Sequence, residues 1–171
     1  LGSDANDFIK LANTNSKGKA IDAGEGDDVL DGGVGSSFLT GGGGNNTFFL
    51  DGRSEGATWS TITDFKINAD KATIWGWRSG TSEIVRIDAS GGALGYEGAT
   101  LHFENLLPSD AEANARNSSW NSLTFTGKSL EDFGVSSLEI LNAEITAGTN
   151  ALLMTGVTVD EFGEHGYLHL A

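Results

Sequence analysis

The chain of 171 residues contains no cysteine and only one proline. The absence of cysteine excludes a disulfide framework, thiolate metal sites and cysteine nucleophiles. One proline beside 25 glycines excludes a proline-rich linker and a collagen-like repeat. No apolar run approaches the roughly 18 residues of a membrane-spanning helix, so we expect no membrane span.

Basic residues are also scarce, because 10 Lys and Arg stand against 24 Asp and Glu, for a formal net charge of −14. Such a polyanion repels nucleic acid and anionic lipid and attracts cations. Hydrophobic residues at 38% suffice for a folded core, and the length fits one domain or two small ones. No signal-peptide pattern follows Leu1, and we expect the chain to be a piece of a longer protein.

The first third of the chain contains a repeat of nine residues. Three units, AGEGDDVLD, GGVGSSFLT and GGGGNNTFF, fill residues 23–49, and the units TNSKGKAID at 14–22 and GSDANDFIK at 2–10 precede them. The eighth position of all five units is a large apolar residue, namely Ile9, Ile21, Leu30, Leu39 and Phe48. A flexible glycine linker has no reason to keep this period, so the repeat predicts regular structure.

A short strand with one inward apolar residue cannot bury it alone, so successive units must stack into a continuous core. Glycine in the other half of each unit permits the tight turns that the period requires. With two units per coil, units n and n+2 lie directly above one another. Loops 2–7, 23–28 and 41–46 then stack along one edge, and loops 14–19 and 32–37 stack along the other.

The sixth position of these loops distinguishes the two edges. It is Asp7, Asp28 and Asn46 on the first edge, and Lys19 and Ser37 on the second. Stacked carboxylates and backbone carbonyls form the all-oxygen site that Ca²⁺ prefers. We predict one good Ca²⁺ site on the first edge, at Asp7 and Asp28. The alternative is two sites on this edge, with the second and weaker one at Asp28 and Asn46. On the second edge, we expect the ammonium group of Lys19 to occupy the space of a cation.

These units resemble the GGxGxDxUx nonapeptide of RTX (repeats-in-toxin) proteins, most closely in GEGDDVLDGG and GSDANDFI. The following stretch resembles the one that commonly succeeds the last RTX repeat, and the matching residues are Phe48-Phe49, Glu55, Ile62-Thr63-Asp64-Phe65, Asp70-Lys71 and Ile74. The resemblance covers residues 1 to about 77 and implies a right-handed parallel β-roll. Carried over residue by residue, the implied Ca²⁺ ligands are Gly2, Asp4, Asp7, Ala23, Gly24, Gly26 and Asp28 at the first level, and Gly42, Gly44 and Asn46 at the second.

The resemblance also implies a location and a partner. RTX repeats lie near the C-terminal end of large secreted bacterial proteins, which leave the cell through a type I exporter that recognises an uncleaved C-terminal signal. Residues 160–171 have the acidic-then-apolar pattern of such a signal. Similar proteins often close the last Ca²⁺ site with two acids. Glu55 matches one of them, whereas Ser60 stands where the second is usual.

The remaining two-thirds of the chain predicts mainly strands separated by Gly, Asn, Asp and Ser clusters, as in antiparallel sandwiches. The candidate strands are 58–65, 72–77, 83–88, 99–106, 120–126, 137–145, 151–158 and 166–170, and the candidate short helices are 109–116 and 129–133. The predicted fold is therefore all-β. It consists of a short parallel β-roll at 1–55 and an antiparallel, sandwich-like capping and secretion part at 56–171.

No catalytic motif is present, and we expect no enzymatic activity of this chain, although an upstream domain of the parent protein could carry one. The three histidines, His102, His165 and His169, are interpreted as ordinary tucked or solvated residues. The predicted function is a secreted or surface-located module that couples its folding to extracellular Ca²⁺ and supports type I secretion. The alternative is a module that binds polysaccharide or cell surface, with Trp75 and Trp77 on one face of a strand as a sugar-stacking platform.

Overall fold

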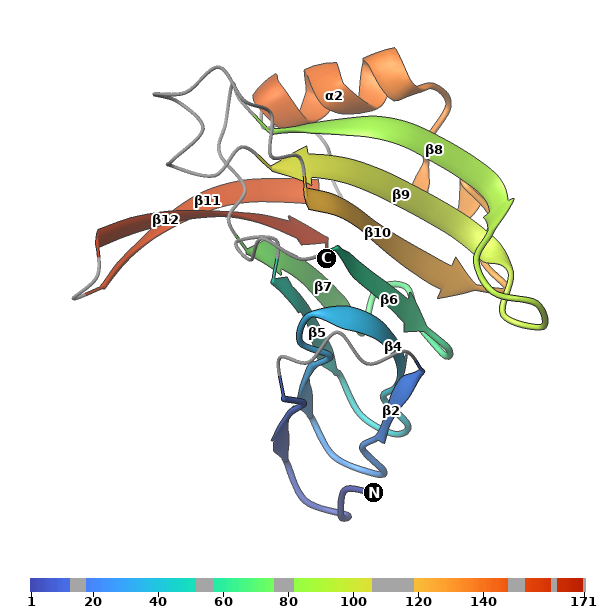
Figure 1. Ribbon diagram of the computed structural model, residues 1–171, viewed down its shortest axis with the longest axis vertical. Helices are drawn as coiled ribbons and strands as arrows, with labels where there is room; N and C mark the ends of the chain where they lie inside the picture. Colours follow the sequence, from blue (N-terminus) through green and yellow to red (C-terminus); the bar gives the residue numbers. More distant parts are fainter. Residues whose placement is uncertain are drawn as a thin grey trace.

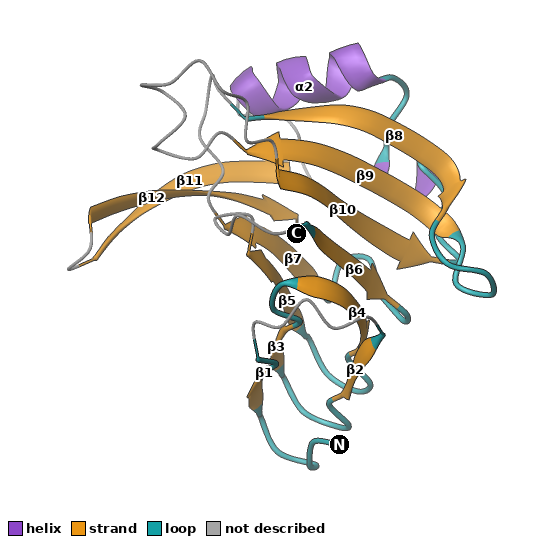
Figure 2. Ribbon diagram, viewed as in Figure 1, coloured by secondary structure: helices purple, strands orange, loops and turns teal. Residues whose placement is uncertain are grey.

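The computed structural model describes residues 1–12, 18–51, 57–75, 82–105, 119–147, 153–160 and 163–170. Within these ranges the protein is mostly β, with two sheets, one short 3-10 helix and one α-helix (Figure 2). The strands are β1 Phe8–Lys10, β2 Lys19–Asp22, β3 Val29–Asp31, β4 Gly35–Thr40, β5 Thr47–Asp51, β6 Thr58–Ile62, β7 Lys71–Trp75, β8 Glu83–Gly91, β9 Gly98–Asn105, β10 Ser119–Thr126, β11 Leu153–Asp160 and β12 Gly163–Leu170.

The chain alternates between the two sheets over its first seven strands. One sheet has the order β1-β3-β5-β7-β12-β11 and the other the order β2-β4-β6-β10-β9-β8. The strands of each sheet are parallel up to β7 and β6, and β10 is also parallel to β6. The remaining neighbours, β12, β11, β9 and β8, are antiparallel, so the later strands extend both sheets (Figure 1).

The pairing register confirms the predicted stacking of every second repeat unit. Ile9 pairs with Leu30, and Leu30 pairs with Phe48 in the first sheet. Ile21 pairs with Leu39 in the second sheet. The eighth positions therefore form two columns, because parallel strands in register place equivalent residues side by side.

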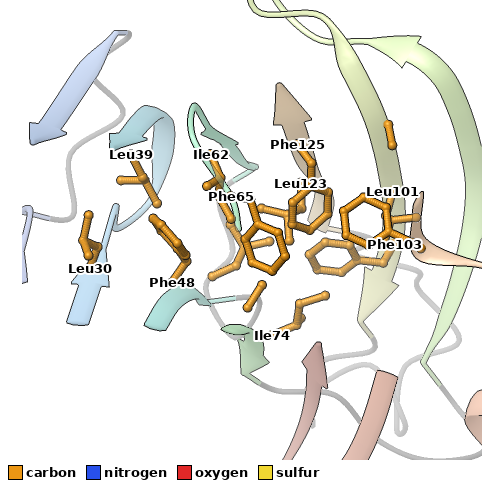
Figure 3. Close-up of a cluster of buried hydrophobic side chains, with 14 of the residues drawn as sticks. Leu30, Leu39, Phe48, Ile62, Phe65, Ile74, Leu101, Phe103, Leu123 and Phe125 are labelled. Carbon is orange, nitrogen blue, oxygen red and sulfur yellow. The ribbon is translucent and has the colours of Figure 1, made fainter. Parts of the chain in front are cut away.

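These columns fill the space between the two sheets. Leu30 and Leu39 are completely buried and Phe48 is 2% exposed, whereas Ile9 at the end of its column is only partly buried. Figure 3 shows the labelled side chains continuing from this part into the later strands. Each unit thus buries its apolar residue against its neighbours, which is the stabilisation expected of stacked repeats.

A cluster of four phenylalanines joins the core of the repeats to that of the later strands. The ring centroid of Phe65 lies 6.1 Å from that of Phe48 and 4.9 Å from that of Phe125. Phe133 completes the cluster at 4.7 Å from Phe125. The apolar core is therefore continuous along the molecule. The boundary between a β-roll at 1–55 and a capping part at 56–171 stays a prediction.

The predicted strand at 137–145 is wrong, because this segment forms the helix α2, Leu138–Ala147. The Ser137 hydroxyl accepts a hydrogen bond of 3.2 Å from the backbone N–H of Ile140, which is an N-cap contact. Leu141 is buried and Leu138 partly buried, whereas Ile140 is 48% exposed. Apolar residues three apart lie on one side of a helix, and the alternation that indicated a strand was incidental.

The other predicted strands of the later part correspond to β6–β12, with ends shifted by a few residues. The helical turn predicted at 129–133 is the 3-10 helix η1, Glu131–Phe133. The predicted helix at 109–116 lies outside the described residues. None of the described helices is both long and apolar enough to cross a membrane.

Candidate metal centre

The loops of the first edge stack so closely that glycine backbone of one loop lies against carbonyl oxygens of the previous loop. A Cβ atom on Gly24 would lie 2.5 Å from the carbonyl oxygen of Ser3, and one on Gly42 would lie closer still to that of Gly24. The N–H of Glu25 donates to the Ser3 carbonyl at 3.2 Å, and the N–H of Gly43 to that of Gly24 at 2.7 Å. Backbone oxygens are therefore concentrated between the loops, and only glycine fits there.

The sixth positions of the loops form a column of side chains linked to backbone N–H groups. The N–H of Asp7 donates to Oδ1 of Asp28 at 2.8 Å, and the N–H of Asp28 donates to Oδ1 of Asn46 at 3.0 Å. The N–H of Asn46 in turn donates to Oδ1 of Asp70 at 2.8 Å. The column thus contains the three predicted residues of this edge and a fourth one, Asp70, which lies beyond the repeats.

The Asp28 carboxylate is the least satisfied polar group of this column. Asp28 is 1% exposed, and its Oδ2 is buried without a hydrogen-bond partner among the described residues. The carboxylate of Asp7 differs, because its Oδ2 accepts hydrogen bonds from the N–H of Ser3 at 2.7 Å and from the Ser3 hydroxyl at 2.9 Å. A buried carboxylate oxygen without a donor is strongly unfavourable unless a cation compensates it.

The other predicted ligands of the first level lie in the same two loops as this pair. Gly2 packs against the carbonyl oxygen of Ala23, and a Cβ atom on Gly2 would lie 2.9 Å from Oδ2 of Asp7. Gly26 packs against the backbone of Ala5 in the first loop. Asp4 is exposed on the same loop.

Side chains alone do not make a metal site in the described ranges, where no three Asp, Glu or His residues form a metal-binding group. Any ion at this level would therefore take most of its ligands from backbone carbonyls. Such carbonyls suit hard cations with oxygen ligands, and Ca²⁺ accepts a flexible shell of 6–8 oxygens. At the first level, the buried Oδ2 of Asp28, which has no hydrogen-bond partner among the described residues, is the charged oxygen that such an ion would need.

The second predicted level has a different composition. The Nζ of Lys66 donates hydrogen bonds to the carbonyl oxygens of Gly42 and Gly44. The side-chain amide of Asn46 donates to the Gly43 carbonyl at 2.8 Å. An ammonium group therefore already contacts the two glycine carbonyls assigned to this level. Lys66 lies outside the nonapeptide period, which is why the repeat pattern gave no signal for it.

On the second edge, the Lys19 ammonium group is surrounded by backbone carbonyls, as the sequence predicts. Its Nζ donates to the carbonyl oxygens of Val34 at 2.6 Å, Gly32 at 2.7 Å and Ala12 at 3.3 Å. Burial lowers the pKa of this ammonium group, and the negative charge of Asp31 opposes the shift. The lysine thus supplies the positive charge on this edge.

The acids that close the column differ from those considered for that role in the sequence. Glu55 lies outside the described residues, and the hydroxyl of Ser60 lies 3.1 Å from that of Ser37 in the interior. Asp64 instead accepts the N–H groups of the loop glycines at positions 41 and 42, at 2.9 and 2.8 Å. Oδ2 of Asp70 accepts the N–H of Lys66 at 2.8 Å. Both acids bind backbone N–H groups at the last loop.

Of the two tryptophans predicted as a sugar-stacking platform, only Trp75 belongs to a described element, the strand β7. Trp77 lies outside the described residues, and the side chain of Trp75 is not among those described. Within the predicted export signal at 160–171, residues 163–170 form β12, which pairs with β7 and β11. The chain matches no protein-family model and no curated protein.

Proposed function

We propose that this chain is an RTX-type Ca²⁺-binding module whose stability depends on extracellular calcium. The observation that carries the proposal is the buried Oδ2 of Asp28, which lacks a hydrogen-bond partner among the described residues. The alternation of the first strands between two sheets and the register of the repeat units support a parallel β-roll.

The ion would be held at the first level by the carboxylate of Asp28, with Asp7 and the backbone oxygens of loops 2–7 and 23–28. When bound, Ca²⁺ compensates the buried negative charge and links the two loops through shared oxygen ligands. We propose a single site, because the ammonium groups of Lys19 and Lys66 contact the carbonyls of the other levels.

The function follows from linkage between ion binding and folding. Without calcium, the uncompensated Asp28 carboxylate lowers the free energy of unfolding. Each tenfold excess of free Ca²⁺ over the dissociation constant adds about 1.4 kcal/mol to the folded state. A site of sub-millimolar affinity in millimolar calcium thus contributes about 1–3 kcal/mol, which is a large part of a typical folding free energy.

This dependence suits export in an unfolded state. In a calcium-poor cytoplasm the module would stay poorly folded and competent for a type I exporter, and it would fold after release into calcium-containing surroundings. We accordingly propose a secreted or surface location, a C-terminal recognition by the export machinery, and a structural rather than catalytic role for this chain in its parent protein.

Thermal unfolding of the chain in 5 mM CaCl₂, in 5 mM MgCl₂ and in excess EGTA tests the proposal. Calcium is expected to raise the melting temperature by about 3–10 °C over EGTA, since 1–3 kcal/mol corresponds to that shift at this chain length. Magnesium should give little of this effect, because it demands a smaller octahedral shell. Equal melting temperatures in calcium and EGTA would overturn the proposal.

A further inference from the structure

The outer face of the second sheet carries two rows of side chains in register across five strands. One row consists of Ser36, Trp59, Ser122, His102 and Arg86. The next row consists of Phe38, Thr61, Thr124, Thr100 and Asp88. These residues line an open hollow of about 750 Å³, which lies within the size range of small-molecule sites. The hollow is on the opposite face of the sheet from the core.

One end of the hollow is aromatic. Trp59 on β6 is 55% exposed, so a large part of its indole ring is accessible. Phe38 on β4 packs against Tyr96, with ring centroids 4.9 Å apart and Tyr96 itself 42% exposed. Aromatic rings in this arrangement present both a flat apolar face and a polar atom to a ligand.

The other end is a cluster of three polar side chains on β8 and β9. Oδ2 of Asp88 lies 2.8 Å from Nη2 of Arg86 and 2.8 Å from Nε2 of His102. The exposed fractions of the three side chains are 63% for Arg86, 36% for Asp88 and 21% for His102. Their mutual contacts orient the three groups while leaving polar surface open to a ligand.

The charge of the hollow differs from that of the chain. Among its lining residues one arginine and one aspartate carry opposite charges, whereas the whole chain has a net charge of −14. A nucleic acid or other polyanion would be repelled by the surrounding surface. A cation would find only one carboxylate, which is already paired with Arg86. The hollow therefore favours an uncharged ligand with both apolar and hydroxyl surface.

We propose that this hollow binds a neutral oligosaccharide. The C–H face of a sugar ring would stack on the indole of Trp59, and sugar hydroxyls would bind the polar cluster of Arg86, Asp88 and His102. Carboxylate and guanidinium groups bind hydroxyls with charge-assisted hydrogen bonds, which are stronger than those between neutral groups. The site is separate from the calcium loops and does not depend on the proposed calcium function.

Isothermal titration calorimetry in saturating calcium tests the proposal with four neutral probes, cellohexaose, xylohexaose, mannohexaose and maltohexaose, and one anionic probe, hexaguluronate. At least one neutral hexasaccharide is expected to bind, and Trp59→Ala should weaken that binding about tenfold or more. Asp88→Asn should weaken it as well. The matched control is Phe8→Ala, because Phe8 is 70% exposed on β1 of the other sheet.

Phe8→Ala should bind the same sugar with the affinity of the unmodified chain. Trp59→Ala and Phe8→Ala should both keep the melting temperature of the unmodified chain. In the unmodified chain, the indole N–H resonance of Trp59 should shift on addition of the sugar. This NMR readout tests the site even if a variant folds poorly. Absence of binding to all four neutral probes, binding confined to hexaguluronate, or unchanged affinity in Trp59→Ala would each overturn the proposal. None of these outcomes depends on whether calcium stabilises the fold.

Discussion

The backbone N–H of Asp7 donates a hydrogen bond of 2.8 Å to Oδ1 of Asp28, across 21 residues of sequence. This bond fixes the Asp28 carboxylate against the first loop, while its second oxygen is buried without a hydrogen-bond partner among the described residues. The first loop thus positions the carboxylate, but no described residue donates a hydrogen bond to its second oxygen. A cation between the two loops would supply the missing partner.

The substitution Asp28→Asn tests the charge at that position. Asparagine can still accept the Asp7 N–H through its side-chain oxygen, but it places a neutral NH₂ group where the unpaired oxygen lies. We expect the calcium-induced rise in melting temperature to fall below about 1 °C. In EGTA the variant should be at least as stable as the unmodified chain, since it buries no uncompensated charge.

The control for this substitution is Asp22→Asn, which removes the same charge from an exposed side chain at the end of β2. This variant should keep the full calcium effect. If differential scanning calorimetry gives Asp28→Asn the same calcium-dependent shift as Asp22→Asn, the assignment of the buried carboxylate is wrong.

Gly42→Ala tests the close stacking of the calcium-edge loops. Gly42 has φ of 78°, and a Cβ atom there would collide with the carbonyl oxygen of Gly24. Gly127→Ala is the matched control, because Gly127 has φ of 69° but an added Cβ would meet no described atom within 4 Å. The control should cost about 1–2 kcal/mol for the left-handed backbone alone.

Gly42→Ala should cost about 3 kcal/mol or more, because the steric collision adds to the backbone strain. Urea unfolding in calcium measures both values. Equal losses for Gly42→Ala and Gly127→Ala would contradict the loop stacking described for residues 23–28 and 41–46.

Lys19→Met tests the half-buried ammonium group of the second edge. Methionine preserves the apolar stem but removes the donor that binds the carbonyls of Gly32 and Val34. The expected loss is about 1–3 kcal/mol, and it should be the same in calcium and in EGTA. The control Lys71→Met changes an exposed lysine and should have little effect. A loss that appears only in calcium would contradict the role of Lys19 as a substitute cation.

The pKa of Asp88 provides a test of the polar cluster on the second sheet. Burial alone would raise the pKa of this carboxyl, but its hydrogen bond to His102 and the charge of Arg86 outweigh that effect and lower it. The titration midpoint of the Asp88 ¹³Cγ resonance should therefore lie below the usual value of about 3.9. His102→Gln and Arg86→Gln should each move it upward.

The sign of the accompanying stability effect follows from the direction of that shift. Since the folded-state pKa lies below the unfolded-state value, ionisation of Asp88 stabilises the fold above about pH 3.9, and this contribution is lost as the pH falls through the folded pKa. The effect should be small, because the side chain is 36% exposed and solvent screens its partners. A midpoint at or above 3.9 would contradict the cluster geometry.

The sequence was sufficient to predict the features that depend on the repeat itself. A period of nine with an apolar eighth position predicted the pairing of Leu30 with Phe48, because stacked units must place equivalent residues side by side. The same phase placed Asp28 in a loop of the first edge and Lys19 in one of the second. These are local consequences of a regular pattern.

Features that depend on contacts between the repeats and later segments could not be predicted. Asp70 and Lys66 join the loop column from positions more than 20 residues beyond their partners, and neither belongs to the repeat. Asp88 and His102 meet across paired strands whose register includes an irregularity that no local sequence signal specifies. These contacts depend on strand pairing and loop packing between segments far apart in the sequence.

A crystal structure of this chain grown in calcium, with an anomalous difference map to locate the ion, would show whether a cation occupies the space beside Asp28. We expect one anomalous peak between loops 2–7 and 23–28, within about 2.3–2.6 Å of Oδ2 of Asp28 and of several backbone oxygens. A map with no peak beside Asp28, or with peaks only at other positions, would contradict it.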